Sequence, residues 1–452
     1  MRFRRIGLIL LSMILLLCSS CQKTPIGQGD LSDCEIAEQP EPQYMAYHFS
    51  ESARVGDDIY FVSGPSFSAK AQIFATEYGA ENFGPFIPCF DAVCNHYDRT
   101  KCCIAVGAFG HYTNKISAFL YDGDISLVLF SEFDVSLSKP YSNEKLNLVF
   151  EDILNIDYIL EPDRITEYHE ALRSTPRKSN PLVYKDYFYY FENNNGTRTQ
   201  YRVPLSGGNP ERVFEEDEII VKTIINDRFY GIRYEKDEED KTQVYYFRSD
   251  MNYENVEPLP EILYSFSLLN KQNCRLMLNV LFDADADYLY VLDDMKVWKI
   301  PDSDIHAEPI LMSDMTEKLP TDPLNLTADL WDDLWYNDSV IYSVIHTGKC
   351  NRSLPNSQGI SASPTQWYES STLYSFDIRT GECNEWVITN QNYLIDLILY
   401  ADDKYVYAQG RYVHEDGRAI QGVTMRLTLD TMRYEVILPD RFLEYSAETT
   451  TE

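Results

Sequence analysis

A single pattern recurs along this chain: an acidic turn followed by a short apolar strand that ends in tyrosine. The clear copies begin at Asp58, Asp186, Asp227, Asp287, Asp338 and Asp403, and a weaker copy, ending in Leu127, begins at Asp122. Measured at the tyrosine or at Leu127, consecutive copies lie 41 to 67 residues apart. Repetition of one unit at this period is typical of architectures in which each unit buries its apolar faces against its neighbours.

The best copy, Asp186–Phe214, predicts the structure of the unit. Tyr187–Phe191 is aromatic throughout and therefore apolar on both faces, as expected of a strand between two neighbouring sheets. Asn195-Gly196 supplies the two positive-φ residues of a tight hairpin turn. A strand with alternating apolar residues over Tyr201–Leu205 follows, and a Gly-rich turn leads into a third strand at Arg212–Phe214. Three strands joined by two turns fit one blade of a β-propeller.

The chain is therefore predicted to be an all-β protein, a β-propeller of four-stranded antiparallel blades. Seven copies predict seven blades; six blades, with the Leu127 region as an insertion, and eight blades are the alternatives. A blade needs about 40 to 50 residues, so the longer steps carry insertions. One of them, Pro162–Arg173, has apolar residues at i, i+3, i+4 and i+7, which predicts a short helix on the rim.

The first 20 residues predict a lipoprotein signal peptide. Three arginines stand within the first five residues, Ile6–Leu17 is apolar, and Ser19-Ser20 precedes Cys21. The apolar run is too short for a stable membrane span. We expect lipidation at Cys21, with palmitate among the acyl groups. Cleavage before Cys18 and an ordinary secretory signal are the alternatives.

The remaining boundaries follow from composition. Residues 21–43 predict a flexible tether, 44–441 the propeller and 442–452 a disordered tail. The expected location is the extracytoplasmic face of the cell membrane, where the lipid anchors a monomeric protein.

Charge excludes one class of partner. The formal net charge is -32, and it becomes -35 when the three signal arginines are removed. Such a chain is repelled by nucleic acid, so we expect no nucleic-acid partner. A protein or carbohydrate ligand remains open, and acidic loops that keep the protein soluble explain the charge equally well.

The densest group of chemically reactive residues lies after the first copy. It comprises Cys89, Cys94, His96, Cys102 and Cys103. Thiolate and imidazole donors on a short loop suit a tetrahedral structural zinc ion, with one of the last two cysteines completing the shell. Disulfides are the alternative that an extracytoplasmic location favours, although they leave His96 without a role. Free thiols are the third reading.

Two other motifs are weaker. Asp283, Asp285 and Asp287, with Asp294 at the twelfth position, resemble a calcium loop, but Tyr288 occupies the position that needs glycine. An acidic hairpin turn is therefore the better prediction. A disulfide between Cys350 and Cys383 is disfavoured, because the predicted strands place these residues near opposite ends of a blade.

No enzyme signature is present: the sequence has no G-x-S-x-G, H-E-x-x-H, phosphate-binding or dinucleotide-binding motif. Apart from His96 and from His169 on the helical stripe of Pro162–Arg173, the histidines are scattered, and they are His48, His111, His306, His346 and His414.

Asp186–Phe214 resembles the repeats of bacterial TolB-like and low-density-lipoprotein-receptor-like (YWTD-type) propellers, which run from an aromatic strand through a Tyr-Arg-Val strand to a Gly-Gly-Asn turn. The Cys89–Cys103 segment resembles one that follows the first blade in propeller lipoproteins of low-GC Gram-positive bacteria. These resemblances imply a fold and bring no activity, since propellers host binders, scaffolds and enzymes.

The sequence thus favours a membrane-anchored propeller lipoprotein that acts as a ligand- or protein-binding scaffold module, with its ligand at one end of the central channel. The alternative is an extracytoplasmic propeller enzyme, a lyase, lactonase or hydrolase acting on a carbohydrate or small metabolite.

Overall fold

In the computed structural model, the described residues run from 45 to 438 with internal gaps. The gaps are 51, 64–71, 80–114, 132–133, 140–143, 150–174, 195–196, 217, 237–241, 265–279, 286, 294–295, 315–334, 338, 353–364, 389–392 and 414–418. The chain divides into two units, Met1–Pro40 and Glu41–Glu452. Every described residue belongs to the second unit.

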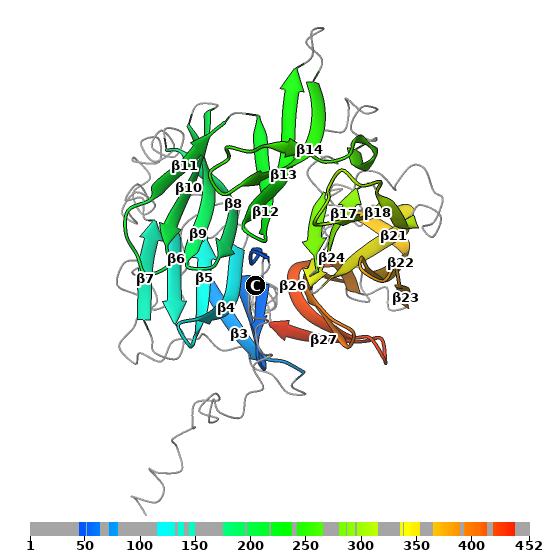
Figure 1. Cartoon of the computed structure of the whole chain (residues 1–452). Coiled ribbons are helices and arrows are strands. Elements are labelled where there is room, and N and C mark those ends of the chain that lie inside the picture. The colour runs from blue at the N-terminus through cyan, green and yellow to red at the C-terminus, as the bar shows by residue number, and fades with distance from the viewer. Residues whose placement is uncertain are drawn as a thin grey trace, which may run out of the picture. The chain divides into compact units, whose positions relative to one another are not determined.

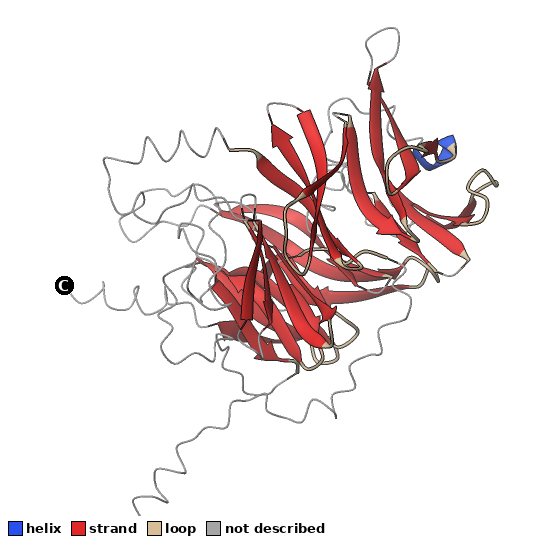
Figure 2. Ribbon diagram, turned by 60° about the vertical axis from the view of Figure 1, so that its left-hand side comes forward, coloured by secondary structure: helices blue, strands red, loops and turns tan. Residues whose placement is uncertain are grey.

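The described strands form seven sheets, which we call blades 1 to 7 in chain order. Within each blade, strands that follow one another in the chain pair antiparallel. Three strands are described in blade 1 and four in each of the others. Most of the strands are labelled in Figure 1. Figure 2 shows that nearly all of the described structure is strand.

Blades 1 to 4 occupy the first part of the described chain. Their strands are β1 (Ser52–Val55), β2 (Asp58–Ser63), β3 (Gln72–Glu77); β4 (Lys115–Tyr121), β5 (Asp124–Phe130), β6 (Val135–Lys139), β7 (Glu144–Val149); β8 (Arg177–Tyr184), β9 (Tyr187–Asn194), β10 (Thr197–Pro204), β11 (Glu211–Glu215); β12 (Ile219–Ile225), β13 (Arg228–Lys236), β14 (Thr242–Asp250) and β15 (Glu257–Pro258).

Blades 5 to 7 follow a 3-10 helix, η2 (Glu261–Tyr264), the single helix in the described part of the chain. Their strands are β16 (Leu281–Ala284), β17 (Tyr288–Asp293), β18 (Lys296–Pro301), β19 (Ile310–Asp314); β20 (Trp335–Asn337), β21 (Val340–Arg352), β22 (Thr365–Asp377), β23 (Cys383–Ile388); β24 (Tyr393–Ala401), β25 (Tyr405–Val413), β26 (Ala419–Thr428) and β27 (Arg433–Leu438).

The acidic turn of the sequence pattern joins the first and second strands of a blade. Asp122-Gly123 has φ angles of 54° and 79°, and Asn226-Asp227 has 48° and 56°. Left-handed conformation at both residues of a two-residue loop is what a type I′ turn requires. The aromatic residue that follows lies in the second strand, where Tyr230 is fully buried.

In two blades the aspartate side chain itself holds the acidic turn. Asp285 Oδ1 accepts hydrogen bonds from the backbone N–H groups of Asp287 and Tyr288, at 2.9 and 2.8 Å. Asp402 Oδ1 accepts the same pair from Lys404 and Tyr405, also at 2.9 and 2.8 Å. Part of the acidic surplus is thus turn structure. The prediction of a hairpin turn rather than a calcium loop at Asp285 agrees with these bonds.

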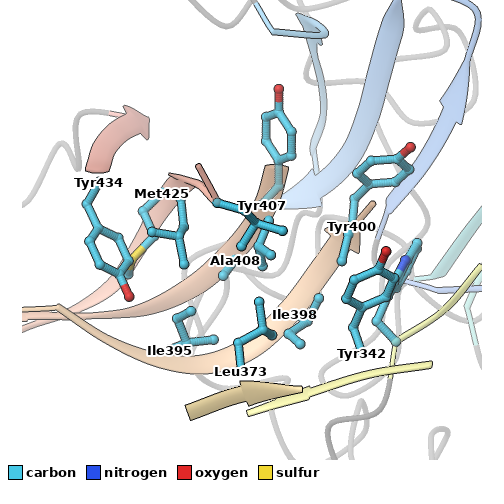
Figure 3. Packing of buried hydrophobic residues seen from close by; sticks show 14 of the residues in the cluster. Tyr342, Leu373, Ile395, Ile398, Tyr400, Tyr407, Ala408, Met425 and Tyr434 are labelled. Atoms are coloured by element: carbon cyan, nitrogen blue, oxygen red, sulfur yellow. The ribbon is translucent and has the colours of Figure 1, made fainter. Parts of the chain in front are cut away.

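Buried apolar clusters join each blade to the next. Phe188 of blade 3 shares a cluster with Val128 of blade 2, and the other neighbouring pairs share similar clusters. In the cluster drawn in Figure 3, Tyr407 of blade 7 packs with Leu373 of blade 6 and with Ile59 of blade 1. Because blade 7 contacts blade 1 as well as blade 6, the seven blades close a ring, which confirms the predicted propeller.

The first strand of each blade stands at the axis of this ring. β1 lies beside β4 and β24, β12 lies beside β8 and β16, and β20 lies beside β24. The fourth strands form the outer edge. Each first strand is covered on both faces by neighbouring blades, so its unpaired edge is directed toward the axis.

Side-chain hydrogen bonds connect blades 1 and 7. The Ser52 hydroxyl donates to the carbonyl oxygen of Leu399. Asp402 Oδ2 accepts from the Tyr78 hydroxyl at 2.5 Å and from Arg54 Nη1 at 3.4 Å, and the Arg54 guanidinium lies 3.5 Å from the centre of the Tyr78 ring. Within the described ranges, the contacts between blades 1 and 7 include these side-chain hydrogen bonds and the apolar packing of their shared cluster.

Pairing in blade 6 agrees with the prediction against a Cys350–Cys383 bridge. Cys350 pairs with Trp367 near one end of β21 and β22, whereas Cys383 pairs with Phe376, which faces Ile341 near the other end. The nine residues from Ile341 to Cys350 separate the two positions by about 30 Å along the strand.

Several predictions fall outside the described residues, namely the signal peptide, the tether, the helix at Pro162–Arg173 and the C-terminal tail. Within the part of the chain that the structure describes, no helix has the length and apolar character needed to cross a bilayer.

Candidate functional site at the axis of the ring

The segment from Met45 to Ser50 runs along the inner edges of three blades. Ala46 N–H donates to Ile224 O of β12 at 2.8 Å, and Tyr47 exchanges backbone hydrogen bonds with Val183 of β8 at 2.8 and 3.2 Å. Ser50 exchanges two more with Ile116 of β4, at 3.1 and 2.6 Å. Because these strands present their unpaired edges to the axis, the segment lies inside the ring.

The segment crosses the ring from one end to the other. Met45 pairs with Ile225, the last residue of β12, and Ser50 pairs with Ile116, the second residue of β4. Both pairings are antiparallel. The first strands run toward the acidic turns, so the chain enters the ring at the acidic-turn end, at Met45.

His48 is the central side chain of this segment. Its Nε2 lies 3.2 Å from Thr223 Oγ1 of β12. His48 keeps solvent-exposed surface although protein atoms surround it, as expected for a group lining the axis of a ring. This enclosure lowers the pKa of His48 to about 4, against a smaller opposing effect of Asp283 and with a further lowering by Lys222. The imidazole is therefore neutral at physiological pH.

Lys222 is the extra residue of a β-bulge in β12. Val221 pairs with Gly231 and Thr223 with Tyr230, which leaves Lys222 as the extra residue of β12. It is also the single residue of this seven-residue strand that is not buried. Since neighbouring blades cover both faces of β12, the open direction for Lys222 is the axis.

Gly231 makes this bulge sterically acceptable. A Cβ atom at position 231 would overlap the carbonyl oxygen of Ile220. The two backbones can approach closely only because glycine has no side chain.

Lys222 keeps part of its surface exposed, but the protein atoms around it still desolvate the ammonium group. This desolvation and, to a smaller extent, the charge of Lys115 on β4 together lower the pKa of Lys222 to about 8. Desolvation and a like charge both disfavour the protonated form. The two lysines, from blades 2 and 4, therefore interact across the inner edge of the ring.

The carboxylate that acts on the pKa of His48 belongs to an ion pair between blades 5 and 6. Asp283 of β16 is 2% exposed. Arg379 binds its carboxylate with two hydrogen bonds, Nε to Oδ2 at 2.7 Å and Nη2 to Oδ1 at 2.9 Å. Tyr336 of β20 also hydrogen-bonds to Asp283, and burial raises the pKa of that tyrosine well above its ordinary value. The negative charge of Asp283 is thus held by blade 6.

This arrangement is equipped for binding. It brings together a neutral imidazole, a hydroxyl and two ammonium groups, next to a carboxylate that an arginine already holds. Among the described residues, no group of three or more His, Cys, Asp and Glu side chains could hold a metal ion.

The lipidation and cysteine-cluster residues predicted from the sequence are not among the described residues. Cys21 and the cluster of Cys89, Cys94, His96, Cys102 and Cys103 fall outside the described residues, and both remain predictions. Asp283 belonged to the calcium-like motif, and the structure shows it paired with Arg379.

Sequence reasoning treated His48 as one of the scattered histidines and missed Lys115, Lys222 and Thr223. One signal was available, because Lys222 is a lone charge within the apolar strand Ile219–Ile225. A buried strand with one lysine marks a position where a charge is held among apolar residues.

No protein-family model and no curated protein sequence matches this chain. Similar solved structures include a puromycin-hydrolyzing peptidase of Mycobacterium tuberculosis, with a TM-score of 0.45, 10% identity and coverage of 86% of this chain and 53% of that one. This chain therefore spans about half of the peptidase's length.

Two further similar structures are a protease's β-propeller domain and a TolB protein. The β-propeller domain of the Trilobed protease from Pyrococcus furiosus has a TM-score of 0.43 and 9% identity, with coverage of 88% of this chain and 99% of that one. TolB from Acinetobacter baumannii has a TM-score of 0.29 and 11% identity, with coverage of 72% and 68%. At such values, no activity of these proteins transfers to this chain.

The fold follows from the chain's own sheets and their packing. Each blade pairs antiparallel, consecutive blades share buried clusters, and the last blade contacts the first. The chain is a seven-bladed β-propeller that carries an enclosed group of polar side chains at its axis.

Proposed function

We propose that this protein is a lipid-anchored, extracytoplasmic propeller that binds a ligand at the axis of its ring. The observation that carries the binding role is the convergence of His48, Thr223 and Lys222 at the inner edge of blade 4, opposite the ion pair of blades 5 and 6. Propellers present ligand sites at this position because a rigid ring holds side chains from several blades in fixed places.

The anchoring role is supported by the sequence before the ring. A basic start, an apolar run and Cys21 precede the tether in the order that a lipoprotein signal requires. Since the chain enters the ring at Met45, 24 residue steps separate it from Cys21. Such a tether reaches at most about 80 Å when fully extended.

The described chain begins at the acidic-turn end of the ring, where Met45 pairs with Ile225 beside the turn Asn226-Asp227. Anionic headgroups repel acidic turns, which favours a propeller held clear of the membrane surface.

Detergent partitioning and metabolic labelling with an alkyne fatty acid test the anchor. We expect the wild-type chain to carry the label and to enter the detergent phase, and a Cys21→Ala variant to do neither. A matched Cys18→Ala variant should behave like the wild type. Labelling that persists in Cys21→Ala, or a wild type that stays in the aqueous phase, contradicts the proposal.

A further inference from the structure

We propose that the axis of the ring binds an oxyanion group, the carboxylate or phosphate of a small ligand, between Lys115 and Lys222, with Thr223 and His48 as hydrogen-bonding partners. The inference assigns a ligand class to the binding role proposed above. It rests on that role and not on the lipid anchor.

The backbone places the two lysines around one short segment. Lys115 immediately precedes Ile116, which exchanges two hydrogen bonds with Ser50. Lys222 immediately precedes Thr223, whose hydroxyl lies 3.2 Å from the His48 ring. His48 and Ser50 are two residues apart, so blades 2 and 4 each bring one ammonium group to the same part of the segment.

The His48 and Thr223 pair offers a hydrogen-bond donor in either tautomer. If the Thr223 hydroxyl donates to Nε2, then Nδ1 carries the proton and is the free donor. If Nε2 donates to Thr223, the hydroxyl proton is free instead. A neutral imidazole beside a hydroxyl therefore leaves one donor for an acceptor oxygen, which an oxyanion supplies.

Charge favours an anion at this place although the chain as a whole is strongly acidic. The carboxylate whose charge acts on His48 is Asp283, and Arg379 holds both of its oxygens. Two partly buried ammonium groups attract an anion more strongly than the same groups do in water. The acidic turns at one end of the ring repel anions. Lys115 and Lys222 therefore form a local positive region within a negatively charged protein.

The charge of Lys222 lowers the stability of the folded protein. Burial disfavours its charge, and an apolar side chain would suit the apolar strand β12 better. The bulge and Gly231 nevertheless hold this lysine toward the axis. A residue whose charge destabilises the folded protein, but which the backbone positions, is characteristic of a binding site.

The test is a titration of the full chain, purified in a nonionic detergent at low ionic strength and pH 7, with inorganic phosphate in one arm and acetate in the other. Calorimetry and thermal unfolding report binding. We expect saturable binding of at least one anion, weakened about tenfold or more in Lys222→Met and Lys115→Met, in line with the loss of a charge-assisted contact. Thr223→Val should weaken it about threefold or more, as expected for one neutral hydrogen bond.

Lys404→Met is the matched control, because Lys404 is an exposed lysine on the turn between β24 and β25. Its affinity should equal that of the wild type. The arm that binds more tightly distinguishes a phosphate ligand from a carboxylate ligand. Equal affinity in Lys222→Met and the wild type, or no saturable binding in either arm, overturns the proposal.

If Lys222→Met does not fold, Lys115→Met decides, and wild-type affinity in that variant overturns the proposal. Failure of the anchor is distinguishable from these outcomes. The detergent-phase assay uses Cys21→Ala, whereas anion binding is measured on a chain with an intact Cys21.

Discussion

The guanidinium group of Arg379 in blade 6 forms two hydrogen bonds with the carboxylate of Asp283 in blade 5, at 2.7 and 2.9 Å. Asp283 is 2% exposed and Arg379 is 35% exposed, so one partner is deeply buried and the other is partly solvated. Arg379 lies in the turn between β22 and β23, so the pair joins the first strand of blade 5 to blade 6, whose first strand also contributes Tyr336 beside Asp283. Both stability and the site depend on it.

Replacing Arg379 with methionine should lower the free energy of unfolding by about 3 kcal/mol, because the buried carboxylate of Asp283 then loses its charged partner. Chemical denaturation measures this change. The matched control is Arg212→Met, which removes an exposed pair with Glu215. That change should cost less than about 1 kcal/mol. Equal effects of the two substitutions would show that the Asp283 pair does not stabilise the fold.

Asp402→Asn should loosen the junction between blades 1 and 7. The substitution keeps an oxygen for the turn but removes the acceptor for Tyr78 and Arg54. We expect a loss of about 2 kcal/mol in the free energy of unfolding, as for removal of a partly buried charged acceptor. Hydrogen exchange in β1 to β3 should become faster.

The control for that change is Asp285→Asn. Asp285 holds a turn of the same kind and accepts from Tyr290 at 2.7 Å, but this tyrosine belongs to its own blade. Its replacement should leave exchange in β1 to β3 unaltered. An equal acceleration of exchange in both variants argues against a junction that depends on Asp402.

Lys222→Met should stabilise the folded protein at neutral pH. The folded-state pKa is about 8 against 10.5 for an unperturbed lysine, so the folded protein bears the full penalty of the charge below pH 8. At 1.36 kcal/mol per pKa unit this penalty is about 3 kcal/mol at most. Above pH 8 the folded lysine is neutral, and the cost of removing its proton falls until the unfolded lysine also titrates near pH 10.5, so the advantage of methionine should shrink over this range. A pH-independent difference between the two proteins in urea unfolding contradicts this account.

His48 should make stability fall in mildly acidic solution. Its pKa is lowered from 6.5 to about 4 in the folded protein, so the unfolded chain binds the proton first as pH falls. Relative to His48→Gln, the wild type should therefore lose stability between about pH 6.5 and 4 and keep a constant difference above pH 7. The charged and polar groups near the imidazole are Asp283, Lys222 and Thr223, and of these Asp283 alone favours the imidazolium by its charge. A parallel profile in both proteins would mean that Asp283 offsets the desolvation of the charged imidazole.

The cysteine cluster from Cys89 to Cys103 remains a prediction. Native mass spectrometry of the chain, purified without chelator and combined with thiol alkylation, should find one bound zinc ion or two oxidised cysteine pairs. Thiols that alkylate fully without reduction or metal removal contradict both alternatives.

Much of the fold could be predicted because its signals are local. The turn Asp122-Gly123 needs positive φ at both residues, and aspartate and glycine supply it through short-range sterics and hydrogen bonds. The aromatic strand Tyr187–Phe191 requires apolar neighbours on both faces wherever it lies. Each copy of the pattern therefore identified a blade, including the weak copy at Asp122.

The axial site depends on contacts of a different kind. His48 and Asp283 are 235 residues apart in the chain, and Lys115 and Lys222 are 107 apart. A register shift of one residue at the bulge decides where Lys222 points, and the missing side chain of Gly231 permits that shift. Neither effect leaves a repeated pattern in the sequence.

The sequence by itself determined the repeating unit and the position of its turns, and it favoured seven blades over six or eight, because turn chemistry and strand alternation act over a few residues. Only the tertiary structure decided that the segment from Met45 to Ser50 lies inside the ring and that its histidine meets lysines from blades 2 and 4. The physical reason is closure. Packing of blade 7 against blade 1 places all the first strands around one axis, and that proximity is a property of the whole ring.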